Sequence, residues 1–321
     1  MDAEELELFT KSLRHATAQH AGAALDAALD EMGWRDALTA HPDTAVATLF
    51  ALQGAAATTS SALDDVIVAA LGLDPDPGLG VVLPAPGRTG APGAPAGDGV
   101  AVAGLGTCGL SHRGRAVVVT GDGQGYAATV VATADLDVRP VHGIDPPLGL
   151  VAVAGDRVTA PAAAERAPVP WAAAVAAGQR AVAHELVGAS RRMLDLAREH
   201  AVERVQFGRP IAAFQAVRHR LAESFVAIEA ADAALGAAAG DDDPPLAAAL
   251  AKAIAGRSAR TVARHCQQVL AGVGFTTEHD LHRYVRRVLV LDRLLGDSRS
   301  LTRQLGGDLL DRRALPALPP L

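Results

Sequence analysis

The chain has 321 residues, of which 50% are hydrophobic, and a formal net charge of -7. This composition excludes a mainly disordered protein, because disordered chains are poor in hydrophobic residues. The negative charge argues against a nucleic-acid partner, which needs a basic face. The start, MDAEELELF, lacks the basic n-region of a signal peptide, and no apolar run reaches the ~18 residues of a membrane span. We therefore expect a soluble cytoplasmic protein with no membrane span.

Metal binding is not predicted. The two cysteines, Cys108 and Cys266, lie far apart and lack the CxxC or Cys/His spacing of a metal site, so neither structural zinc nor a disulfide framework is expected. His184-Glu185 lacks the second histidine of an HExxH motif. The acidic and histidine residues at 278–282 fall at a predicted helix start, where acidic groups also suit the helix dipole.

Residues 1–78 are predicted to form an N-terminal helical domain. Apolar residues recur there at helical spacing up to about residue 73. Ser61 and Asp64 have the spacing of a capping box, with Asp in place of the usual Glu, so we expect a helix to begin after Ser61. The segment Asp74-Pro-Asp-Pro-Gly78 closes the domain, because Pro and Gly break helices.

Residues 79–165 are predicted to form a small middle β domain. Short β-branched runs alternate there with Gly, Pro and Asp, which is typical of an antiparallel sheet. The Pro- and Gly-rich segment 87–99 is predicted to be a mobile surface loop. Residues 104–109 match GxGxxG, but a strand pattern follows where a dinucleotide site needs a helix. We interpret these glycines as turn residues.

Residues 166–321 are predicted to form a C-terminal helical bundle. Its expected helices cover 170–203, 210–239, 244–270 and 279–305, and Gly- or Pro-containing breaks separate them. Short breaks between long helices favour an antiparallel four-helix bundle. The predicted fold class is therefore α+β: a helical domain, a small β domain and a four-helix bundle.

Two segments of the predicted bundle carry a more specific pattern. Their key residues are Ala201, Arg204, Phe207-Gly208, Ile211 and Gln215 in the first, and Gln268, Gly272, Gly274-Phe275 and Glu278, followed by Arg286, in the second. Together these residues resemble the C-terminal domain of the acyl-CoA dehydrogenases. The resemblance covers about residues 175–305, and the order of helices, strands and helices agrees with the fold of that family.

The resemblance implies an FAD site that is shared at a subunit interface. The residues that it implies are cofactor-binding are Arg204, Gln206, Phe207, Gln215, Gln268, Gly272 and Ser298. Arg204 would hold the FAD pyrophosphate of the neighbouring subunit, a role that suits the forked contacts of a guanidinium with phosphate. Gln215 would contact the flavin, and Gln268 with Gly272 would line the adenosine end. We therefore expect an oligomer.

The catalytic base of the family is missing. The family reaction removes the α-proton of an acyl thioester while a hydride leaves the β-carbon for FAD, so it needs a carboxylate base. Leu295 occupies the position of the family glutamate, and Gly178 occupies the alternative position in the first bundle helix. Asp297 is the remaining candidate for a displaced base. The family's flavin-facing β-domain segment also has no equivalent near residues 103–110, where Thr107 stands almost alone.

Three hypotheses remain open from the sequence. In lacking the base, the chain resembles the shortened, non-catalytic subunits of bacterial heteromeric acyl-CoA dehydrogenases. By this hypothesis it would complete the FAD site of a catalytic partner, in a heterotetramer that acts on an acyl-CoA substrate. A second hypothesis is a self-sufficient homomeric flavoenzyme with a displaced base or altered chemistry. A third is an acyl-CoA-binding or structural relative that has lost FAD.

Overall fold

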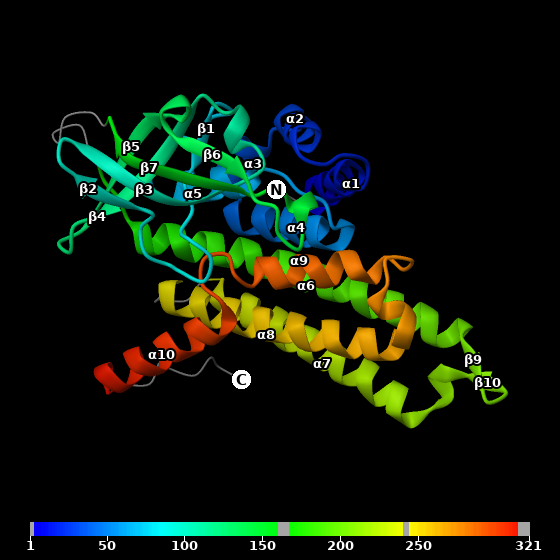
Figure 1. Ribbon diagram of the computed structural model, residues 1–321. Helices are drawn as coiled ribbons and strands as arrows, with labels where there is room; N and C mark the ends of the chain where they lie inside the picture. The colour runs from blue at the N-terminus through cyan, green and yellow to red at the C-terminus, as the bar shows by residue number, and fades with distance from the viewer. Residues whose placement is uncertain (1–2, 160–166, 240–243, 314–321) are drawn as a thin grey trace.

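The computed structural model describes residues 3–159, 167–239 and 244–313. Five N-terminal helices come first: α1 (Ala3–Gln19), α2 (Ala23–Glu31), α3 (Trp34–Ala40), α4 (Pro42–Ala56) and α5 (Ala62–Ala70). Figure 1 shows these helices beside a β-sheet, with long C-terminal helices running beneath both. Among the residues described, no helix is both long and apolar enough to cross a bilayer.

The N-terminal helices join the C-terminal region through a close crossing of α4 and α6 (Trp171–Glu203). Gly54 of α4 faces the backbone carbonyl of Glu185, and Gly188 of α6 faces that of Ala51. A Cβ atom at either glycine would collide with the opposite backbone. Only glycine permits so close an approach, so these two positions fix how the helices pack.

The sheet contains β1 (Leu79–Val81), β2 (Gly93–Ala96), β3 (Gly99–Gly106), β4 (Arg115–Gly121), β5 (Tyr126–Ala132), β6 (Asp137–Pro140), β7 (Val151–Val158) and β8 (Ala167–Pro168). Its order is β6-β7-β3-β2-β4-β5-β8, and β1 also pairs with β4. Most neighbours are antiparallel, with Val117 opposite Val130 and Val102 opposite Gly155, for example.

Two predictions about this region need correction. The sheet is mixed, because β1 and β2 both run parallel to β4. The segment 87–99 is not simply a surface loop, since it contains strand β2, whose Gly93 packs against Val118 and Thr120 of β4. The GxGxxG glycines lie in β3 and the turn after it, and one 3-10 turn leads from there into β4. That arrangement agrees with their interpretation as strand and turn residues.

The C-terminal region consists of α6, α7 (Gln215–Ala238), α8 (Pro244–Leu270), α9 (Leu281–Leu291) and α10 (Ser298–Arg312). A two-strand hairpin, β9 (Val205–Gln206) and β10 (Arg209–Pro210), joins α6 to α7. The expected fourth helix, 279–305, is wrong as one piece. Leu295 and Gly296 have φ angles of 55° and 96°, and this left-handed backbone separates α9 from α10.

The main hydrophobic core crosses all three regions of the chain. Trp34 and Phe50 of the N-terminal helices, Val117 of the sheet, and Leu186 and Val262 of the long helices belong to the same buried cluster. A smaller cluster, which includes Val100, Val118 and Val153, fills the other face of the sheet. The division at 78/79 and 165/166 stays a prediction, and the second boundary lies outside the described residues.

Candidate functional site

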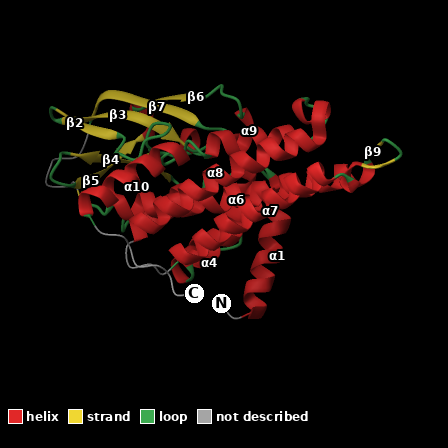
Figure 2. Cartoon of the chain, turned by 90° about the horizontal axis from the view of Figure 1, so that it is seen from below, coloured by secondary structure: helices red, strands yellow, loops and turns green. Residues whose placement is uncertain are grey.

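The residues expected to bind FAD gather, with one exception, at the end of the bundle farthest from the sheet, where Figure 2 shows the hairpin. They are Arg204 at the end of α6, Gln206 and Phe207 in the hairpin, Gln215 at the start of α7, and Gln268 and Gly272 where α8 ends. The rings of His200 on α6 and His279 after α8 lie 6.3 Å apart, which brings these segments together.

These side chains form an open surface with the donors that a dinucleotide needs. All six residues are exposed, and a Cβ atom at Gly272 would meet no atom within 4 Å. A guanidinium suits pyrophosphate, amide side chains suit polar edges, and an aromatic ring can stack on a base. The set therefore fits the pyrophosphate and adenosine part of FAD.

The hairpin holds its aromatic ring in an unusual way. Phe207 has a φ of 53° and Gly208 a φ of 76°, so both turn residues have left-handed backbone. Phe207 is 91% exposed, and its ring forms an edge-to-face pair with Phe214, with ring centres 6.1 Å apart. The guanidinium of Arg209 lies 4.4 Å from the centre of the Phe214 ring. An exposed aromatic residue on a strained turn is typical of a contact surface.

Ser298 is the exception. It begins α10, where its backbone N–H and its hydroxyl both donate to the Asp292 carboxylate, at 3.0 and 3.3 Å. It lies against Gly256 of α8, more than three helical turns, or about 18 Å, before Gln268. The structure therefore does not place Ser298 with Arg204 and the other candidate FAD residues.

The two possible positions of the catalytic base lie next to each other, and apolar side chains fill the space between them. Leu295 is 1% exposed, and its Cδ1 atom lies 2.5 Å from the place where a Cβ atom of Gly178 would stand. Cδ1 of Ile67, from α5, lies 3.2 Å from the same place. A carboxylate from either position would project into this packed apolar contact.

The loop that carries Leu295 is held from below by α6 and α8. The side-chain amide of Gln179 donates to the Leu295 carbonyl at 2.9 Å. The buried ammonium of Lys252 donates to the carbonyls of Asp292 and Gly296, at 3.0 and 3.2 Å. Burial lowers the pKa of Lys252 to about 8, against the pull of Asp292. These hydrogen bonds fix the left-handed turn and so keep Leu295 in the packed position.

Asp297 caps α10. Its carboxylate accepts from the backbone N–H groups of Arg299 and Ser300, at 3.1 and 2.9 Å, and pairs with Arg293 at 3.2 Å. Burial, the largest influence, raises its pKa, but the hydrogen bonds from Ser300 and Arg299 and the charge of Arg293 together bring it below 3.8. A carboxylate with a lowered pKa is a weak proton acceptor, so the geometry does not favour Asp297 as a base.

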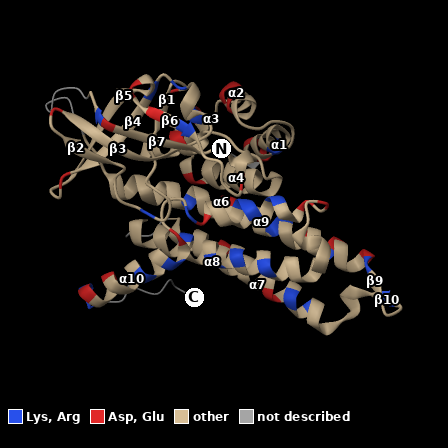
Figure 3. Ribbon diagram, viewed as in Figure 1, with Lys and Arg blue, Asp and Glu red and all other residues tan. Residues whose placement is uncertain are grey.

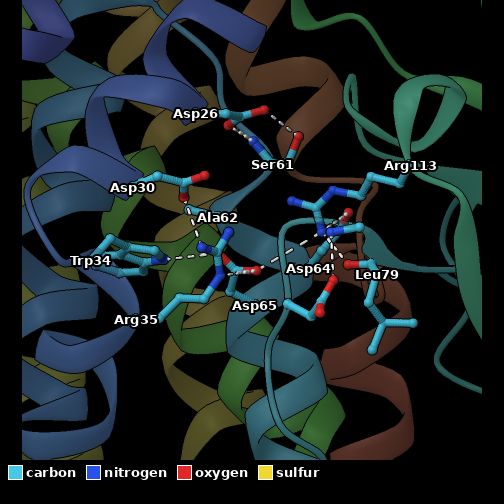
Figure 4. Close-up of polar contacts among 12 residues, drawn as sticks. Asp26, Asp30, Trp34, Arg35, Ser61, Ala62, Asp64, Asp65, Leu79 and Arg113 are labelled. Carbon is cyan, nitrogen blue, oxygen red and sulfur yellow. Dashed lines mark hydrogen bonds and ion pairs between the residues drawn. The ribbon is translucent and has the colours of Figure 1, made fainter.

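Thr107 belongs to a buried polar network between α5 and the sheet, of which Figure 4 shows Asp64, Asp65 and Arg113. Its hydroxyl donates to Asp64 at 2.9 Å, Arg113 lies 3.3 Å from the same carboxylate oxygen, and Trp34 donates to Asp65 at 3.1 Å. Burial raises the pKa of Asp64 to about 7, although Arg113 acts in the opposite direction. Thr107 is therefore committed to α5, and its hydroxyl does not face an open flavin-sized space.

The predicted capping box gives the correct start of α5, but its side-chain hydrogen bonds are wrong. Ser61 occupies the N-cap position, but its hydroxyl makes no cap hydrogen bond and donates instead to Asp26 at 2.8 Å. Asp64 is fully buried instead of reaching back to the start of the helix. The spacing of these residues predicted where the helix begins, while burial against the sheet decided what the side chains do.

Arg287 of α9 forms a second buried polar cluster, which joins all three regions. Its Nε atom pairs with Asp145 at 2.6 Å, and its terminal nitrogens donate to the carbonyls of Thr58 and Ala57, at 2.5 and 3.4 Å. Glu185 of α6 lies 3.4 Å away on another side. Burial raises the pKa of Glu185 to about 7, although Arg287 lowers it.

Sequence reasoning missed the roles of Glu185, Asp145 and Arg287. The signal was present for Glu185, because it interrupts an apolar helical stripe of Val182, Leu186 and Ala189. Glu185 borders a cavity of about 30 Å³, together with Thr59 and Cys108. That cavity has room for a single water molecule and none for an acyl thioester.

Comparison with known proteins supports the same region. The family "Acyl-CoA dehydrogenase, C-terminal domain" matches residues 172–310. Acyl-CoA dehydrogenase IpdE2 of Mycobacterium tuberculosis is 40% identical over 128 residues, which is 40% of each chain. Acyl-CoA dehydrogenase FadE34 of the same organism is 43% identical over 123 residues, or 36% of this chain and 17% of FadE34. The alignments thus span less than half the length of these curated relatives.

Solved structures extend the likeness to nearly the whole chain. The Tcur3481-Tcur3483 steroid ACAD has a TM-score of 0.76 at 22% identity and covers 97% of this chain and 99% of its own. The ChsE4-ChsE5 complex from Mycobacterium tuberculosis has a TM-score of 0.75 at 20% identity and covers 99% of both chains. A glutaryl-CoA dehydrogenase from Mycobacterium smegmatis, solved with FADH2, has a TM-score of 0.71 at 13% identity and covers 98% of each chain.

At these identities the structural likeness establishes the fold, while the sequence match establishes the relationship in the helical region. The structural likeness confirms the predicted fold class, and the sequence match agrees with the family resemblance of the C-terminal helices. Residues 172–310 thus match the C-terminal domain of the acyl-CoA dehydrogenases by sequence, and the chain resembles acyl-CoA dehydrogenases in fold along nearly its whole length.

Proposed function

We propose that this chain is a non-catalytic subunit of a heteromeric acyl-CoA dehydrogenase, in which it completes the FAD site of a catalytic partner. FAD, when bound, accepts the hydride from the acyl thioester. In this proposal the partner supplies the base and the flavin-facing β domain. This chain supplies Arg204 for the pyrophosphate and Gln215, Gln268 and Phe207 for the rest of the cofactor.

The single observation that carries the proposal is the apolar packing at the base position. Leu295 meets the place where a side chain at Gly178 would begin, and Ile67 closes the same contact. Proton abstraction needs a carboxylate within reach of the substrate, and this chain has an apolar contact at both family positions. Glu185 is a buried acid of α6, but it forms an ion pair with Arg287 and borders a cavity that is too small for an acyl group.

The exposed end of the bundle supports the cofactor half of the proposal. Arg204 and Gln268 have exposed side chains that form no hydrogen bond with the described parts of the chain, so they are available to a second chain's cofactor. By contrast, Thr107 and Ser298 both donate their hydroxyls to buried aspartates. This asymmetry favours a half-site over a complete site.

The similar solved structures support a heteromer as well. ChsE4-ChsE5 is a complex of two named proteins, and the Tcur3481-Tcur3483 steroid ACAD likewise pairs two names. We extend the two-chain arrangement of these proteins to this one. Steroid-like acyl-CoA thioesters are one class of substrate for the assembly, on the analogy of that steroid ACAD.

The test is co-expression of this chain with a catalytic acyl-CoA dehydrogenase subunit, followed by measurement of bound FAD per complex from the visible spectrum. Replacing Arg204 by Ala removes a charge-assisted contact with phosphate, so we expect FAD retention to fall about tenfold or more. Arg198→Ala is the matched control, because Arg198 lies on the same helix, is exposed, and pairs with Asp195. The control complex should keep its FAD.

Two results would contradict the proposal. Unchanged FAD content in the Arg204→Ala complex would remove the cofactor role. A yellow homo-oligomer with stoichiometric FAD, which is reduced by acyl-CoA without any partner, would replace the heteromer with a self-sufficient enzyme. A colourless chain that gains flavin only with its partner is the expected outcome.

A further inference from the structure

Helix α7 has an uncovered apolar face on the outside of the bundle. Its inward residues, which include Ser224, Ile228 and Leu235, are buried where α7 packs on α6 and α8. On the outward face, Phe225 is 55% exposed and Val226 is 65% exposed. The other uncharged positions of that face are small, namely Ala222, Ala230, Ala233, Gly236 and Ala237. Large apolar side chains exposed next to each other are typical of a surface that contacts another protein.

The charges of α7 are separated along the helix. Basic residues occupy the half of α7 next to the hairpin, and acidic residues follow (Figure 3). Arg191 of α6 lies 3.7 Å from Glu229 and 3.0 Å from Asp232, so two carboxylates share one guanidinium. Among the described residues, no carboxylate lies within 4 Å of Arg218. One part of the helix therefore has a cation without an acidic partner, and the other part has an acid in excess.

These charges fit a second copy of the same helix that runs in the opposite direction. Two copies related by a two-fold axis place Arg218 of one opposite Glu229 of the other when the axis passes between residues 223 and 224. The same register places Phe225 opposite Ala222, so a large side chain meets a small one. At about 100° per residue, Arg218, Phe225 and Glu229 fall within about 40° of one another around the helix. One flank of α7 thus carries all three, and each contact forms twice.

The polar side chains at the centre of this register are engaged within their own chain. The hydroxyl of Ser224 donates to the carbonyl of Arg220 at 2.8 Å, and Glu223 lies 3.6 Å from His265 of α8. The alanines of the outward face let two helix axes approach to within about 8–10 Å. The centre of the face is therefore suited to close helix packing.

We propose that two copies of this chain associate through α7, packed antiparallel around a two-fold axis. In the heteromer proposed above, this contact would join two half-sites into one assembly. The inference does not rest on that function, because the contact uses none of the residues assigned to FAD or to the base position.

The experiment measures the mass of the full chain alone by sedimentation velocity over a series of concentrations. We expect an equilibrium of monomer and dimer at micromolar concentration, because one helix pair buries less than the ~1,200 Å² of a standard interface. Arg218→Glu or Glu229→Arg should each weaken association by at least about tenfold, because each places like charges opposite each other twice. An equal mixture of these two variants should form the dimer again, since every pair in the mixed dimer then has opposite charges.

A further variant tests the apolar part of the contact. Val226→Ser should weaken association by about fivefold or more, because it removes apolar surface from the interface. Leu8→Ser is the matched control, since Leu8 is 66% exposed and lies on α1. The control should associate like the natural chain. Circular dichroism of each variant establishes that it is folded.

Three outcomes would overturn the inference. The first is a chain that stays monomeric at about 0.3 mM, where even a weak dimer would form. The second is a dimer that both charge reversals leave unchanged. The third is a mixture of Arg218→Glu and Glu229→Arg chains that stays monomeric, which would assign this face to a different partner.

Discussion

Replacing Gly178 by Ala tests whether the base position is filled as described. The new methyl group would start 2.5 Å from Cδ1 of Leu295 and 3.2 Å from Cδ1 of Ile67. Real Cβ atoms do not approach other carbon atoms as closely as the first distance, so Leu295 must move. Its backbone, however, is held by Gln179 at 2.9 Å, which limits that movement. The substitution therefore has two opposite effects on stability: alanine favours the helix more than glycine does, but its methyl group clashes with Leu295.

The size of the effect follows from two terms. Glycine to alanine inside a helix stabilises by about 1 kcal/mol when nothing else changes. Overpacking a filled core costs about 1–3 kcal/mol. We expect Gly178→Ala to lower the free energy of unfolding by up to about 2 kcal/mol. Leu295→Ala alone should lower it by about 2–5 kcal/mol, because it leaves a cavity.

The double variant gives the decisive measurement. Once Leu295 is reduced to Ala, the 2.5 Å clash is gone and the methyl group at position 178 meets only the tight contact with Ile67 at 3.2 Å, so Gly178→Ala should then stabilise by up to about 1 kcal/mol. The two substitutions should thus couple favourably by about 1–3 kcal/mol. Urea unfolding of the four chains, followed by circular dichroism, measures that coupling. If Gly178→Ala stabilises the natural chain as much as the Leu295→Ala chain, the two side chains are not in contact, and the argument against a base there loses its structural support.

Two further predictions concern the buried charges. Arg287→Met should lower the free energy of unfolding by about 3–5 kcal/mol, because it leaves Asp145 and Glu185 buried without their partner. Adding Glu185→Gln to that chain should recover part of the loss in urea unfolding, and no recovery would show that the acid is not the source of the penalty. For Asp64, a folded pKa of about 7 against an ordinary 3.8 means that the folded chain binds the extra proton, so its contribution to stability declines as pH rises from about 4 to 7. Asp64→Asn should flatten that decline in unfolding measurements across this range, and equal pH slopes in both chains would contradict the assignment.

Much of the fold could be predicted from the sequence, because the local patterns of apolar, Pro and Gly residues agree with the packing of the whole chain. Pro and Gly placed the ends of α6 and α8 within a residue or two of their observed bounds. Helical periodicity, however, ran without interruption through Leu295, and only the structure shows the left-handed turn there. A turn held by a lysine from another helix leaves no trace in neighbouring residues, so a local pattern cannot predict it.

The sequence predicted the exposed residues of the candidate site but not the buried charged residues near it. Arg204 and Gln268 follow a family motif, and their exposure agrees with a role toward a second chain. Arg287 and Lys252 could not be interpreted in this way, because a buried charge is defined by partners that are distant in sequence. Lys252, for example, donates to carbonyls at positions 292 and 296, on the far side of α9 in the chain.

The reach of Arg287 has a consequence for how the chain folds during synthesis. Its carbonyl partners, Ala57 and Thr58, precede it by 230 and 229 residues, and Asp145 precedes it by 142. Until α9 leaves the ribosome, these polar groups have no guanidinium to bind, so the N-terminal helices and the sheet cannot reach their final dry packing beforehand. Native contacts between such distant residues also slow folding. The three regions therefore reach their final packing together, only after α9 has been synthesised, and a nascent chain that stops before α9 should expose surfaces that chaperones bind.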